Sequence, residues 1–156
     1  MGVGRFLQEG SFVAKAFLVR TPPMVEDGLR NVLKHSLPEL SIKKARKYLG
    51  DSGVSVNPDL LIHEGSAVAD IKYKRNDGQW NRSDLYEIVA SASAYAAKRA
   101  ALVDFNVKRE DSRPTVWFQQ LAVAHLTWLA NDGISPQLAE SILVDQVRTW
   151  LTSTNQ

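Results

Sequence analysis

The sequence predicts a mixed α/β (α+β) domain in which helices pack on a central sheet, and three observations lead to this fold class. Apolar side chains recur at helical spacing in three segments, at about residues 21–37, 83–95 and 136–151. Between these segments lie apolar stretches that begin and end at turn residues, which is typical of strands. The length of 156 residues and the apolar content of 44% match one globular domain, so we expect residues 1–156 to form a single domain.

The first elements lie before the middle of the chain. Residues 12–19 are apolar and form either a strand or a short extended segment. Thr21-Pro22 begins a helix, because threonine caps helices and proline is tolerated at the first helical position. Pro38 ends this helix, and a short strand is expected at residues 54–56.

A hairpin is predicted next. Residues 59–62 form one strand and residues 67–74 the other, and the turn at residues 63–66 contains a glycine. This hairpin holds the charged residues on which the functional argument depends.

The remaining elements alternate in type. A polar loop at residues 75–82 leads to a helix that Asn81 or Ser83 caps. A strand follows at residues 100–105, and residues 116–129 hold one or two more strands. The last helix has an apolar stripe that packs on the sheet or, alternatively, forms an interface with a second subunit; the stripe consists of Leu138, Ile142, Val147 and Leu151.

Composition limits the chemistry. The chain has no cysteine, which excludes disulfides, thiolate zinc sites and cysteine nucleophiles. Its histidines (His35, His63 and His125) lie far apart without ligand spacing, so we expect any metal to be a hard cation held by carboxylates. A net charge of +2 is too small to identify a nucleic-acid partner by itself. We expect a cytoplasmic protein without a membrane segment, because no apolar run has the length of a membrane span or a signal peptide.

The predicted hairpin brings two aspartates and a lysine together. Asp70 and Lys72 point to the same face of their strand, because side chains alternate along a strand, and Asp59 begins the partner strand beside Asp70. Two carboxylates can hold Mg²⁺ and leave positions open for water and a phosphate oxygen, while the lysine positions or activates the water and neutralises the phosphate. The alternative is a surface hairpin with an ordinary salt bridge.

The pattern resembles a known nuclease signature. Pro58-Asp59 followed by Asp70-Ile71-Lys72 resembles the motif of the PD-(D/E)xK nucleases. The run Ala69–Lys74 and the helix start Ser83–Glu87 resemble the D-x-K-Y-K strand and the D-L-Y-Q helix start of McrC, the nuclease subunit of McrBC-type modification-dependent restriction systems. Residues 17–20, which run into Val25-Glu26, resemble the segment in front of that family's nuclease core.

This resemblance implies a fold and a function. It implies a restriction-endonuclease-like core at about residues 17–105, with further strands and a helix at residues 115–152. It implies a DNA endonuclease of a restriction or defence system that hydrolyses phosphodiester bonds with Mg²⁺, for which Mn²⁺ can substitute. The implied partners are double-stranded DNA, a GTPase or AAA+ motor subunit, and a second copy in a homodimer.

Further site residues are expected from the resemblance and from their positions. Glu26 completes the metal site with Asp59 and Asp70, or it is a solvated acid near a helix start. Lys74, Arg75, Arg82 and Glu87 are candidate substrate contacts, with exposed surface residues as the alternative. A basic cluster either follows a DNA backbone or forms a solvated face; it consists of Lys43, Lys44, Arg46 and Lys47.

Two other functions remain open at this level. The chain could be another PD-(D/E)xK nuclease, such as a junction resolvase or a recombination exonuclease, which would prefer branched DNA or free ends. It could also be a DNA-binding subunit that keeps the fold without catalysis.

Overall fold

The computed structural model describes residues 4–9, 12–17, 21–75, 79–107 and 113–153. Side chains are described from residue 22 onward within these ranges, except at Lys74 and Arg75. In this part of the chain no helix is long and apolar enough to cross a membrane.

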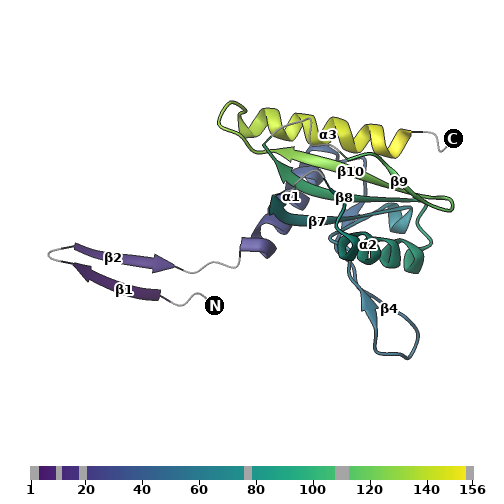
Figure 1. Cartoon of the computed structure of the whole chain (residues 1–156), viewed down its shortest axis with the longest axis horizontal. Coiled ribbons are helices and arrows are strands. Elements are labelled where there is room, and N and C mark those ends of the chain that lie inside the picture. Colours follow the sequence, from purple (N-terminus) through teal and green to yellow (C-terminus); the bar gives the residue numbers. More distant parts are fainter. Residues whose placement is uncertain (1–3, 10–11, 18–20, 76–78, 108–112, 154–156) are drawn as a thin grey trace.

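A six-stranded mixed sheet forms the centre of the fold (Figure 1). Its long strands β7, β8 and β10 are parallel, and the short strands at both edges pair antiparallel. In spatial order the strands are β3 (Ile42–Lys43), β6 (Leu60–Ile62), β7 (Ala67–Arg75), β8 (Arg99–Asn106), β10 (Leu121–Leu129) and β9 (Val116–Phe118).

Helices cover both faces of this sheet. Figure 1 shows α2 (Arg82–Tyr95) on the opposite side of the sheet from α3 (Pro136–Thr152). The helix α1 (Thr21–Ser36) shares one apolar core with α3, and α2 shares a second core with the other face of the sheet. Alternation along the strands separates the two cores, since Ala69 and Ile71 of β7 join the first and Val68 joins the second. The predicted α/β class is therefore confirmed.

Two small sheets accompany the main one. The strands β1 (Gly4–Glu9) and β2 (Phe12–Phe17) form a two-stranded sheet, so the strand alternative is the right one for residues 12–17, while residues 18 and 19 lie outside the described part of the chain. The strands β4 (Lys47–Tyr48) and β5 (Ser55–Val56) form another. The predicted strand at residues 54–56 is thus present, but it pairs outside the main sheet.

Local signals account for the ends of the helices. The side chain of Asn81, rather than Ser83, caps α2 by accepting hydrogen bonds from the N–H groups of Ser83 and Asp84. Ser135 caps α3 by accepting from the N–H of Leu138, and a proline occupies the first turn of this helix.

The turn between β6 and β7 is a short 3-10 helix, His63–Gly65. Gly65 has a φ of 110°, and a Cβ there would lie 3.2 Å from the ring of Tyr95. Both conditions favour glycine. This close approach fixes the hairpin turn against the end of α2.

The buried face of α3 differs from the predicted stripe. Leu138 is 50% exposed, and Ile142 is only partly buried. The residues that the helix buries are Ala139, Leu143, Val144, Val147 and Trp150. Val147 of the predicted stripe is among them, and Leu151 is partly buried against the same core, whereas Leu138 faces solvent.

Candidate active site

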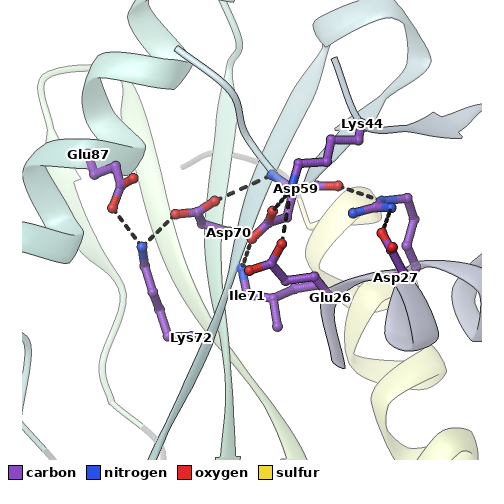
Figure 2. A network of polar contacts seen from close by, with 9 residues as sticks. Glu26, Asp27, Lys44, Asp59, Asp70, Ile71, Lys72 and Glu87 are labelled. Carbon is purple, nitrogen blue, oxygen red and sulfur yellow. Dashed lines mark hydrogen bonds and ion pairs between the residues drawn. The ribbon is translucent and has the colours of Figure 1, made fainter. Parts of the chain in front are cut away.

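The β6–β7 hairpin places Asp59 and Asp70 side by side. Leu60 pairs with Ala69 in the register of the two strands, so Asp59 lies opposite Asp70. The backbone N–H of Asp59 donates to Asp70 Oδ1 (3.3 Å), and the N–H of Ile71 donates to Asp59 Oδ2 (3.0 Å). Both aspartates are buried, at 6% exposure each. The predicted pair is therefore formed, and each carboxylate is oriented by the backbone of the other strand (Figure 2).

Lys72 connects Asp70 to α2. Its Nζ lies 2.7 Å from Asp70 Oδ2 and 2.6 Å from Glu87 Oε2 (Figure 2), and 3.8 Å from Asp84 Oδ1. Burial lowers the pKa of this ammonium, but the charges of Asp70 and Glu87 outweigh burial and raise the pKa above its usual range. Lys72 therefore keeps its proton and acts as a fixed positive charge.

Lys44 joins a third carboxylate to the pair. Its Nζ lies 2.7 Å from Asp59 Oδ1 and 2.9 Å from Glu26 Oε2, as Figure 2 shows. Burial lowers the pKa of Lys44, but the hydrogen bonds to Asp59 and Glu26 raise it overall. Lys44 was expected in a basic surface cluster, and the structure places it instead between two of the three predicted metal ligands.

Arg30 attaches α1 to the start of β6. Its Nε donates to the backbone oxygen of Asp59 (2.9 Å), and its NH1 group pairs with Asp27 at 2.6 Å. Arg30 lies four residues after Glu26, on the same side of α1. Sequence reasoning missed Arg30, although its spacing from Glu26 was a usable signal. The helix thus fixes the backbone of Asp59 and presents Glu26 to the same site.

The two aspartates differ in acidity. Burial raises the pKa of Asp70 to about 6; the ammonium of Lys72 opposes this shift, and the carboxylates of Asp59 and Glu87 add to it. Burial also raises the pKa of Asp59, but Lys44 and the N–H of Ile71 lower it below its usual range overall. Asp59 is therefore held as an anion, whereas the charged form of Asp70 is disfavoured.

The donor set suits a hard divalent cation. Within the described residues, no group of three or more His, Cys, Asp or Glu side chains stands ready to coordinate a metal. The chemistry nevertheless fits, because the site offers carboxylate oxygens and already holds one cation, Lys44, between Glu26 and Asp59. Its carboxylates outnumber its two ammonium groups, Lys44 and Lys72; the carboxylates are Glu26, Asp59, Asp70, Asp84 and Glu87.

The predicted substrate contacts have different outcomes. Glu87 reaches the site, but as the partner of Lys72. Arg82 is exposed at the first position of α2. The side chains of Lys74 and Arg75 lie outside the described part of the structure. The pairing of β7 with β8 shifts register between Lys72 and Arg75.

A second polar cluster, which was not foreseen, lies on the adjacent strands β8 and β10, where Asp104 is the register partner of Lys72. His125 Nε2 lies 2.7 Å from Asp104 Oδ1, and Arg113 pairs with the other oxygen of Asp104 at 2.9 Å. Trp80 packs edge-on against His125 and donates to the oxygen of Pro114. The backbone N–H of Arg113 donates to His125 Nδ1, so both ring nitrogens of this histidine are engaged. These contacts attach Trp80, in the segment before α2, to the sheet.

Comparison with protein-family models and with curated proteins finds no match to this sequence. The fold is similar to that of a chain in a solved structure, the refined half-complex from a tetradecameric assembly of Thermococcus gammatolerans McrB AAA+ hexamers with bound McrC. The TM-score is 0.70 at 14% identity, and the aligned region covers 86% of this chain and 34% of that chain. The protein thus spans about a third of its structural neighbour. The likeness concerns the fold, and the six-stranded mixed sheet between helices fits the predicted restriction-endonuclease-like core.

Proposed function

We propose that this chain is a metal-dependent DNA endonuclease of the PD-(D/E)xK type. One observation carries the proposal: the hairpin register sets Asp59 opposite Asp70 and places Lys72 against Asp70 at 2.7 Å. Burying the two carboxylates of Asp59 and Asp70, with the partly buried ammonium of Lys72 beside them, is unfavourable in an apolar sheet and is typical of a functional site. A pair of aspartates and a lysine is the set that phosphodiester hydrolysis with a divalent cation needs.

Each residue has a role that follows from its contacts. Asp59, Asp70 and Glu26 would hold Mg²⁺ or Mn²⁺. Such an ion, when bound, lowers the pKa of water and stabilises negative charge on the phosphate. Lys72 lies 2.7 Å from Asp70 and 2.6 Å from Glu87, so its part is to position or activate the attacking water and to balance charge at the phosphate. Glu87 holds the Lys72 ammonium in place from α2.

The structural neighbour gives this proposal a biological setting. That assembly contains McrB AAA+ hexamers with bound McrC. We infer by analogy that this chain is the cleavage module of a McrBC-like restriction or defence system and works with an AAA+ or GTPase motor subunit. A single site cuts one strand, so cleavage of both strands calls for a second copy, which fits the predicted homodimer.

Cleavage of supercoiled plasmid tests the proposal. The native chain is expected to nick the plasmid with Mg²⁺ or Mn²⁺ and to stop in EDTA, whereas Asp70→Ala and Lys72→Ala are expected to be inactive. Asp145→Ala, which removes an exposed acid on α3, is the matched control and should retain activity. Activity that persists in Asp70→Ala would contradict the assignment. Absence of cleavage by the native chain together with absence of Mn²⁺ binding would favour a non-catalytic subunit.

A further inference from the structure

The β4–β5 hairpin carries exposed apolar side chains at its tip. Figure 1 shows this hairpin projecting away from the main sheet. Tyr48 is 62% exposed, Leu49 39% and Val54 57%. Gly50 and Gly53, both with positive φ, form the turn that closes the tip. A group of exposed apolar side chains on a protruding element is typical of a surface that contacts another molecule, whereas single exposed apolar residues are common on any surface.

The projection is a fixed arm. At its tip, the N–H of Leu49 donates to the oxygen of Val54 at 2.9 Å. At its base, the hydroxyl of Tyr95 donates to the oxygen of Ala45 at 3.1 Å, and Lys47 Nζ lies 5.2 Å from the centre of the Tyr95 ring. These contacts attach the base to the end of α2. The apolar tip is therefore held in solvent by defined interactions.

The stem of the arm carries positive charge. Residues 43–56 contain four basic side chains and one acidic side chain, Asp51. Lys43 and Lys44 pair with carboxylates outside this segment, with Glu64 and with Glu26 and Asp59 respectively, so Arg46 and Lys47 supply the positive charge of the stem. Arg46 is exposed beside the base of the arm. Positive charge on the stem favours a polyanion as the partner rather than an apolar protein surface.

The arm is continuous with the candidate active site. Lys44, two positions before Arg46, lies 2.7 Å from Asp59 Oδ1. Leu49 lies five positions after Lys44, so a fully extended chain places the tip at most about 17 Å away. This is about half of the roughly 34 Å helical repeat of duplex DNA. One duplex can therefore contact the tip and the active site together.

We propose that residues 43–56 are a DNA-binding arm whose two-stranded ribbon enters a groove of the duplex. A two-stranded β-ribbon fits the major groove, where apolar side chains contact base edges such as the thymine methyl group. The stem residues contact phosphates on both sides of the groove, which fixes the duplex relative to Asp59 and Asp70. The assignment of the nearby site as the cleavage site rests on the proposed function, but binding of DNA by the arm is tested separately.

Metal-free binding to a labelled 20-base-pair duplex, measured by fluorescence anisotropy, is the first test. The double variant Leu49→Ser with Val54→Ser is expected to bind about 5- to 20-fold more weakly, because two apolar contacts are lost. Leu138→Ser on α3, which removes another exposed leucine, should bind like the native chain. Arg46→Ala should reduce the slope of log affinity against log salt by about one, whereas the tip variant should leave that slope unchanged.

Because the chain lacks cysteine, a single introduced thiol reports contact directly. Leu49→Cys carrying a photoreactive benzophenone should crosslink to the duplex, and Leu138→Cys with the same label should not. Native-like binding by the tip variant, or no duplex binding by the native chain, would overturn the proposal; the first result would assign the tip to a protein partner. If the native chain does not cleave plasmid but its binding of DNA still depends on the arm, the proposed function is overturned and the assignment of the arm stands.

Discussion

Replacing Lys44 with methionine is expected to tighten the binding of a divalent cation. The ammonium of Lys44 lies between Glu26 and Asp59, at 2.9 and 2.7 Å, so a cation that these carboxylates hold must displace it. Lys44 is 34% exposed, and each of its two ion pairs therefore contributes only a fraction of a kcal/mol after screening by solvent. Removing both pairs should release on the order of 1 kcal/mol, which is about a fivefold gain in affinity.

Calorimetric titration with Mn²⁺ at pH 7.5 measures this gain. Lys43→Met is the matched control, because Lys43 pairs with Glu64 outside the site at 2.9 Å and its loss should change the affinity less than twofold. Unchanged or weaker binding by Lys44→Met would refute the reasoning, since it would show that the cation and the Lys44 ammonium do not compete for the same carboxylates.

Asp70→Asn should abolish Mn²⁺ binding in calorimetry yet shift the melting temperature by only a few degrees, because burial already disfavours the charged form of Asp70; retained binding would contradict its role as a ligand. The pKa of Asp70 is raised from 3.8 to about 6, so its stabilising contribution to the metal-free protein is present below pH 3.8 and lost as the pH rises through 6. Cation binding needs the carboxylate, so Mn²⁺ affinity should rise about tenfold per pH unit up to pH 6 and then level; a flat profile from pH 5 to 8 would exclude this linkage. Lys72→Met should lower single-turnover plasmid cleavage about 100-fold and leave Mn²⁺ binding intact, and equal loss of both would make Lys72 a structural residue. Glu87→Gln keeps a hydrogen-bond acceptor for Lys72 and should lower cleavage at most about tenfold, so complete inactivation would assign Glu87 a direct catalytic role.

The hairpin at the candidate site could be predicted because its signals are local. Strand alternation, a glycine in the turn and the Pro58-Asp59 start together determine the register that sets Asp59 beside Asp70. The presence of the three long helices was also predictable, since apolar side chains recur at helical spacing in each, and α2 and α3 begin at capping residues. The resemblance then connected Glu26 with the same site, and the structure places it against Lys44.

Other features depend on contacts that no local pattern encodes. The strands β3 and β4 have two residues each and are too short to show a period. Lys44 belongs to a run of basic residues, and only the packing of β3 against β6 brings it to Asp59. His125 lies within an apolar strand, far in the sequence from Asp104, so their pairing arises only when β10 and β8 are adjacent.

The binding position of a divalent cation tests the central claim most directly. A crystal structure of the protein with Mn²⁺, in which anomalous scattering locates the ion, is expected to show the ion bound by carboxylate oxygens of Asp59 and Asp70, with Lys44 displaced from Glu26. An ion bound elsewhere, or a site in which Lys44 still bridges Glu26 and Asp59 at saturating Mn²⁺, would contradict the assignment of these residues as the metal centre of a nuclease.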